Sequence, residues 1–138
     1  MRVNSYILSA KTIIELYKGE MPLATWLKNY FKANKKFGSK DRKHIAHLCY
    51  CYYRLGKAFE NVGVEERIKK GLFLCAEQSN NFLQQVSESW NAAAQLSVPE
   101  KMKMLNATVD NIFPFNNFLS SEIDAKAFNA SLLVQPKL

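Results

Sequence analysis

Apolar residues recur along most of this chain at spacings of three and four, which is the period of an amphipathic helix. The first such stretch contains Val3, Ile7, Ala10, Ile14 and Tyr17, and it stops before the glycine at position 19. No stretch alternates apolar and polar residues in the way that a half-buried strand does. The pattern therefore predicts an all-α bundle.

Glycines and prolines divide the rest of the pattern into further helices. We expect Pro22 to occupy the first position of a second helix, which Gly38 ends. Ser39 can then cap a third helix that runs to about Leu55. The other expected elements are a short helical turn at 58–61, helices at 65–77 and 81–94, a short helix from position 99, a brief helix within 113–124 and a last one at 125–134. The count is about six to eight helices.

The length of 138 residues suits one domain over 1–138, and a hydrophobic fraction of 48% is enough to build a core. Three cysteines without a CxxC pair do not indicate a secreted disulfide scaffold, so reduced thiols in a cytoplasm are the simplest interpretation. No apolar run has the length of a membrane span or the form of a signal peptide. We therefore expect a cytoplasmic protein with no membrane partner.

Positive charge is concentrated in the first part of the chain. Residues 1–57 hold 12 Lys and Arg against 3 Asp and Glu, a net charge of +9, whereas residues 58–138 hold 7 against 9, a net charge of −2. A domain with one strongly basic half typically binds a polyanion, either a nucleic acid or an anionic membrane surface. The alternative is a lysine-rich face that is simply solvated.

The stretch FGSKDRKHIAHLCYCYYRLG, residues 37–56, carries most of the candidate chemistry. At 100° per residue its helix has a core face formed by Ile45, Leu48, Cys49, Tyr52 and Leu55. A second stripe mixes cations with an aromatic ring, which suits phosphates and stacked bases, and consists of Lys40, Lys43, His47, Tyr50 and Arg54. The alternative, favoured for the C-terminal half by the apolar run 48–53, is that the tyrosine is buried and the cations lie at the edge of the core.

The first turn of this helix points more clearly to an anion. This turn contains three cations: Lys40, Arg42 and Lys43. They lie where the helix dipole is positive and where free backbone N–H groups and a preceding glycine favour a bound phosphate. The alternative is an internal salt bridge from Arg42 to a helix carboxylate. Lys35 and Lys36, just before this turn, favour the anion site. The candidate RNA- or phosphate-binding residues are Lys28, Lys32, Lys35, Lys36, Lys40, Arg42, Lys43, His47 and Arg54.

Metal binding and catalysis have weaker support. His44, His47 and Cys51 are spaced three and four apart, so they could share a face, but zinc needs a fourth ligand and no CxxC or HExxH motif is present. We favour two histidines at the solvent edge and a cysteine in the core. The sequence has no GxSxG or GxxxxGK[ST] motif, and its cysteines lie in apolar stretches where a thiol is usually inert. We predict no catalytic or metal site in these residues.

The segment GSKDRKHIAHLCYCYYRLG resembles the signature helix of the NusB-like N-terminal domain of bacterial RNA (cytosine-5) methyltransferases, the Fmu/Sun/RsmB group. That pattern is a serine, any residue, Asp-Arg, and a hydrophobic helix that ends in Tyr-x-x-x-Arg. Its positions correspond here to Ser39, Asp41, Arg42, Ile45, Leu48, Tyr50 and Arg54. Residues 112–138 are similar to the segment that precedes the methyltransferase part, where Gln-Pro leads into a strand.

The resemblance implies an all-helical domain that binds structured RNA, ribosomal RNA above all, beside an S-adenosylmethionine-dependent catalytic domain. That catalytic domain and its cofactor loop are expected further along a longer parent chain, so no cofactor is expected in these residues. The family's catalytic cysteines follow a proline and a threonine, whereas those here follow Leu48, Tyr50 and Leu74, so none is carried over. The alternatives are a stand-alone NusB-type transcription antitermination factor and a helical module that binds an acidic protein or a membrane.

Overall fold

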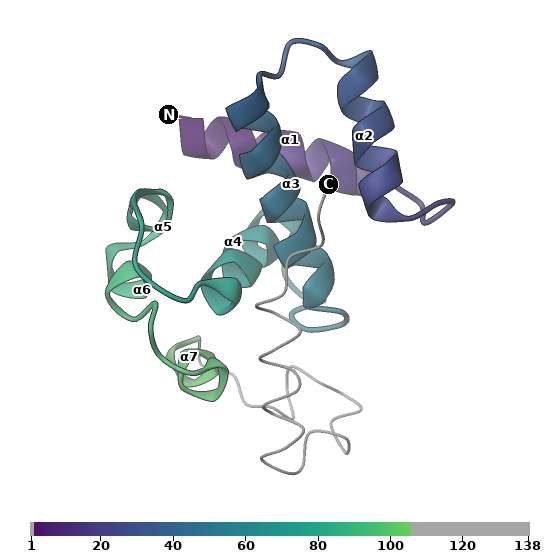
Figure 1. Cartoon of the computed structure of the whole chain (residues 1–138). Helices are drawn as coiled ribbons and strands as arrows, with labels where there is room; N and C mark the ends of the chain where they lie inside the picture. The colour runs from purple at the N-terminus through teal and green to yellow at the C-terminus, as the bar shows by residue number, and fades with distance from the viewer. Residues whose placement is uncertain (1, 106–138) are drawn as a thin grey trace.

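The computed structural model describes residues 2–105, and the regular secondary structure in that range is helical (Figure 1). The seven helices are α1 (Arg2–Leu16), α2 (Leu23–Ala33), α3 (Ser39–Arg54), α4 (Val64–Cys75), α5 (Asn81–Val86), α6 (Glu88–Ala92) and α7 (Val98–Met104). The all-α class and the expected number of helices are thus confirmed. The helices expected from position 113 onward lie outside the described residues. None of the seven is long and apolar enough to cross a membrane.

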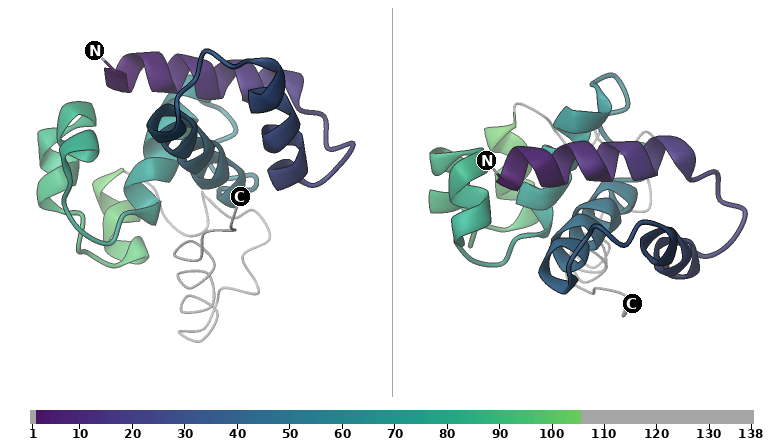
Figure 2. Two further views of the ribbon diagram at one scale, coloured as in Figure 1. Left: turned by 45° about the horizontal axis from the view of Figure 1, so that its top comes forward. Right: turned by 90° about the horizontal axis from the view of Figure 1, so that it is seen from above.

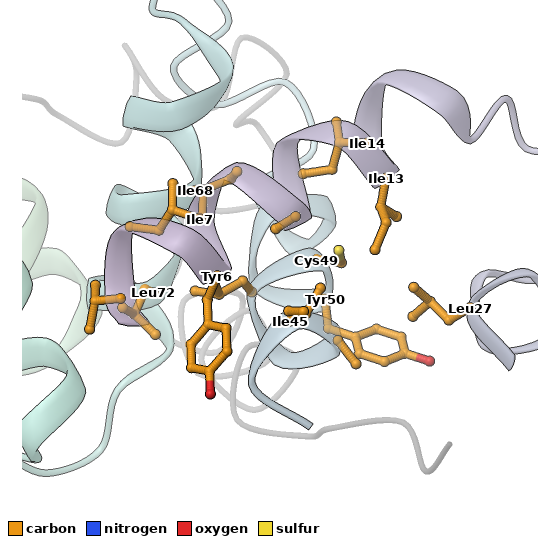
Figure 3. Close-up of a cluster of buried hydrophobic side chains, with 14 of the residues drawn as sticks. Tyr6, Ile7, Ile13, Ile14, Leu27, Ile45, Cys49, Tyr50, Ile68 and Leu72 are labelled. Atoms are coloured by element: carbon orange, nitrogen blue, oxygen red, sulfur yellow. The ribbon is translucent and has the colours of Figure 1, made fainter. Parts of the chain in front are cut away.

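Helices α1, α3 and α4 form the centre of the domain. α3 and α4 have the most extensive contact of any pair, and α1 lies across both (Figure 2). α2 lies on one side of this group, and α5 with α6 lies on the other (Figure 1). Figure 3 shows the side chains that fill the space between these helices, among them Tyr6, Ile7, Ile13, Ile14, Leu27, Ile45, Cys49, Tyr50, Ile68 and Leu72. Apolar burial from four different helices therefore holds the fold together.

The close contact between α3 and α4 depends on a glycine. A Cβ atom at Gly71 would lie 2.7 Å from the carbonyl oxygen of Cys51 and 3.3 Å from the backbone nitrogen of Tyr52. Real Cβ atoms essentially never come within 3.0 Å of such an atom. Only glycine fits this position at the observed separation of the two helices.

The connector between α3 and α4 is held by one arginine of α4. The guanidinium of Arg67 donates to the carbonyl oxygens of Ala58 at 3.0 Å and Gly56 at 2.7 Å, and to the hydroxyl of Tyr52 at 2.8 Å. The chain turns with a left-handed conformation at Gly56 (φ 58°) and Phe59 (φ 59°). Residues 55–61 form turns, so the helical turn expected at 58–61 is wrong.

Several expected helix boundaries are shifted, among them the end of the helix expected at 65–77, since α4 ends at Cys75. Pro22 is the N-cap of α2 rather than its first residue, because its ψ of 142° is extended. α2 ends at Ala33, four residues before the expected stop, and Lys35 and Lys36 therefore lie on a turn. The N-cap of α3 is Gly38, and its amide donates to the side chain of Asp41 at 3.3 Å.

The single helix expected over 81–94 is wrong, because two short helices, α5 and α6, meet there at a break. Ser87 has an extended backbone (φ −164°, ψ 120°), and its hydroxyl accepts a hydrogen bond from the amide of Trp90. The side chain of Asn80 caps α5 in the same way by accepting from Leu83. A serine that accepts from the backbone three residues on competes with helix continuation, and here this local bond starts a new helix.

A buried lysine joins α7 to the end of α4. The side chain of Lys101 is 1% exposed, and its ammonium donates to the carbonyl oxygens of Phe73 at 3.0 Å and Ala76 at 2.5 Å. The last carbonyls of a helix have no partner within it and carry its negative dipole end, so a cation is favourable there. Burial nevertheless lowers the pKa of Lys101 to about 8.

Candidate nucleic-acid interface

The first turn of α3 is anchored to α1 through its one carboxylate. Asp41 accepts hydrogen bonds from the hydroxyl of Tyr6 at 2.5 Å and from the guanidinium of Arg2 at 3.0 Å, in addition to the amide of Gly38. The hydrogen bond from Tyr6, helped by the Gly38 amide and the Arg2 charge, holds the pKa of Asp41 below its ordinary value against a smaller opposite effect of burial. Asp41 is therefore committed to α1.

The cations around this turn consequently have no carboxylate partner. Between positions 21 and 59 the chain has nine Lys and Arg but only one acid, Asp41. The ion pairs within residues 2–105 join other residues, and the predicted alternative, a salt bridge from Arg42 to a helix carboxylate, is not among them. Arg42 instead donates to the carbonyl of Gly38 at 3.4 Å. Seven cations without an ion pair in the described range form what we call the α2–α3 cations: Lys28, Lys32, Lys35, Lys36, Lys40, Arg42 and Lys43.

Three of the α2–α3 cations line a groove between α2 and α3. Lys28 of α2 and Arg42 and Lys43 of α3 line a hollow of about 320 Å³, together with apolar residues of α2 that include Leu27 and Phe31. The other members are exposed on α2, on the turn at 34–38 and at the start of α3. The structure therefore brings one lysine of α2 beside two cations of α3, and the remaining members are exposed on the segment that joins the two helices and on their ends.

The predicted stripe along α3 does not continue to its end. Tyr50 is buried, 8% exposed, and its ring points from α3 toward Leu27 of α2 (Figure 3). Burial raises the pKa of its phenol, so the ring is part of the core and not a stacking surface. Arg54 lies fourteen residues after Lys40, which is about 21 Å along a helix. The alternative of a buried tyrosine is thus confirmed, and Arg54 lies far from Lys40 along α3.

The cysteines are buried, and the two histidines are half-buried at the edge of the core. The Sγ atom of Cys51 lies 3.5 Å from Nε2 of His47, while the ring of His44 stacks on aromatic rings of other helices. Burial raises the pKa of Cys49 to about 12, and a hydrogen bond with Cys75 together with burial raises the pKa of Cys51. Protonated, buried thiols are poor nucleophiles. In the part of the chain that the structure describes, no three His, Cys, Asp or Glu side chains are placed to hold a metal ion.

Sequence reasoning missed an aromatic cluster on the other side of α3. The ring of His44 lies 5.1 Å from that of Tyr6 and 5.3 Å from that of Phe82, with interplanar angles of 20° and 24°. These residues come from α1, α3 and α5, so no spacing along the sequence relates them. Lys40 and His44 line hollows on this side, whereas Arg42 and Lys43 line the groove on the side of α2.

Comparison of the chain with protein families, with curated proteins and with solved structures found no match.

Proposed function

We propose that this domain binds structured RNA through the α2–α3 cations. The observation that carries the proposal is the commitment of Asp41 to Arg2 and Tyr6, which leaves seven neighbouring cations without an acidic partner. Cations that crowd the positive end of a helix destabilise it unless an anion is bound there. Phosphate groups along a nucleic-acid backbone supply such anions at regular spacing.

The resemblance of the α3 segment to the NusB-like domain of RNA methyltransferases favours RNA over other polyanions. It also suggests which RNA and which neighbouring domain are involved. The domain would hold ribosomal RNA beside an S-adenosylmethionine-dependent cytosine-5 methyltransferase domain of the same parent chain. The residues described here would contribute binding and orientation, and none of them would take part in methyl transfer. A role as a stand-alone antitermination factor uses the same RNA surface, so binding to RNA is the property to test first.

Salt-dependent binding to an RNA hairpin provides the test. If all seven cations contact phosphates, a slope of about 0.7–0.9 per contact lowers the association constant by about 900- to 6,000-fold between 50 and 200 mM salt. A triple variant removes the three cations of the α2–α3 groove: Lys28→Gln, Arg42→Gln and Lys43→Gln. With four contacts left and a slope of about 0.7–0.9 per contact, its association constant falls only about 50- to 150-fold over the same range.

A matched control removes three cations from other parts of the surface and leaves the same net charge: Lys18→Gln, Lys69→Gln and Lys103→Gln. We expect this control to keep the salt dependence of the original protein in fluorescence anisotropy titrations. Equal losses in both triple variants would show that net charge matters and not this surface. Undetectable binding of the unmodified protein at 50 mM salt would overturn the proposal altogether, and the acidic-protein or membrane partner would then be preferred.

A further inference from the structure

Two adjoining hollows lie on the side of α3 that faces α5, and the α2–α3 groove is not part of them. One has a volume of about 460 Å³ and the other about 440 Å³, and both are lined by Lys40, His44, Asn81 and Phe82. We call them together the α3–α5 cleft. Each hollow alone is within the range of small-ligand sites, about 300–1,000 Å³.

The polar groups of the cleft are available to a ligand. Within residues 2–105, the ammonium of Lys40, the imidazole of His44 and the side-chain amides of Asn81 and Gln85 make no hydrogen bond to another residue. An amide both donates and accepts, as the edge of a nucleobase does. These groups therefore offer one cation and two amides around the same space.

Aromatic rings form the wall that the two hollows share. His44 and Phe82 line both, with their rings 5.3 Å apart and nearly parallel, and Tyr6 supports them from α1 at 5.1 Å and 6.0 Å respectively. The rings of His44 and Phe82 are only half-buried, so part of their surface faces the cleft. A half-exposed ring beside amides and a cation is the composition that holds an unstacked base and its phosphate.

The charge in the cleft is also favourable for a phosphate. Asp41 lines one hollow, but its carboxylate already accepts from Arg2, Tyr6 and the backbone at the start of α3. The two positive charges of Arg2 and Lys40 exceed the single negative charge of Asp41 by one. Lys40 belongs both to the α2–α3 cations and to the cleft, so one RNA strand can contact the two surfaces on either side of α3.

We propose that the α3–α5 cleft holds one unpaired nucleotide of the bound RNA, with its base against Phe82 and His44 and its phosphate at Lys40. This inference rests on the proposed function, since it names the part of the RNA that the cleft selects. It implies that RNA with an unpaired nucleotide binds more tightly than a fully paired stem of equal charge. A stacked base contributes about 1–3 kcal/mol, so the expected preference is about 5- to 100-fold.

The test compares two RNA hairpins of equal length at one salt concentration, one fully paired and one with a single bulged 2-aminopurine. We expect tighter binding of the bulged hairpin and a change in 2-aminopurine fluorescence on binding. Phe82→Leu should abolish both effects and leave the salt slope unchanged, because the phosphate contacts persist. Phe37→Leu is the matched control, since this half-buried phenylalanine lies beneath the cation of Lys36 and outside the cleft.

Equal binding of the two hairpins, or an unchanged preference in Phe82→Leu, overturns this inference and leaves the proposed function standing. Loss of salt-dependent binding to both hairpins overturns the proposed function. In that case titration with adenosine 5′-monophosphate, followed by NMR of the His44 and Phe82 ring protons, still tests whether the cleft binds a nucleotide. Saturable shifts of these protons support a nucleotide site, and their absence at millimolar ligand rejects it.

Discussion

Replacement of Gly71 by alanine tests the close contact of α3 and α4. The added Cβ would lie 2.7 Å from the carbonyl oxygen of Cys51, and ordinary contacts begin at 3.4 Å, so the helices must separate by about 0.7 Å. The obstacle is backbone, which cannot rotate away as a side chain can. Overpacking of a core costs about 1–3 kcal/mol, and a rigid obstacle places this change near the upper limit. Alanine regains about 1 kcal/mol of helix propensity.

The net expectation is a loss of about 2 kcal/mol in the free energy of unfolding, which corresponds to a fall of roughly 7 °C in Tm for a domain of 138 residues. Thermal and urea unfolding followed by circular dichroism at 222 nm measure both quantities. Gly63→Ser is the control, because nothing lies within 4 Å of a Cβ there and serine is favoured at the N-cap of α4. Helix propensity alone predicts that Gly71→Ala is stabilising. A rise in Tm would therefore refute the close contact.

Two further predictions concern ionisable groups. Lys101 is protonated up to about pH 10.5 in the unfolded chain but only up to about pH 8 in the folded protein. The free energy of unfolding should therefore rise by about 1 kcal/mol between pH 7 and 9 relative to that of Lys101→Met. Urea unfolding at each pH measures this rise, and parallel pH profiles of the two proteins would contradict it. The folded-state pKa of Asp41 is lowered, so its contribution to stability is present above its ordinary pKa of about 3.9 and is lost as pH falls through the lower value. Tyr6→Phe removes the main cause, and its deficit in Tm should be largest near pH 6 and should shrink below pH 4, whereas a constant deficit would indicate lost packing alone.

Helix periodicity was sufficient to predict the main elements of the described fold. The five apolar positions expected to form the core face of α3 are buried, apart from Tyr52, which is half-buried. The prediction of this face succeeds because α3 is covered by neighbouring helices on most sides, so its apolar positions coincide with its buried positions. The break at Ser87 was missed because a serine hydroxyl that caps a new helix has the same sequence pattern as a polar position within a continuous one.

The candidate site was only partly predictable for a different reason. The α2–α3 cations are close in sequence, and their lack of acidic neighbours is visible in the sequence itself. That Asp41 is committed to Arg2 and Tyr6 depends on contacts across 35 and 39 residues, which no local pattern contains. The α3–α5 cleft likewise requires α5 to pack beside α3, and Phe82 looks like an ordinary core residue in the sequence.

The arginine that holds the connector after α3 links the order of that segment to the position of α4. Arg67 reaches back to residues 52, 56 and 58, so its three hydrogen bonds exist only while α4 is docked. Separation of α4 would leave the carbonyls of Gly56 and Ala58 without this partner, and the left-handed turn at Phe59 without its support. The end of α3, the connector and the start of α4 therefore gain and lose their order together, as one cooperative unit.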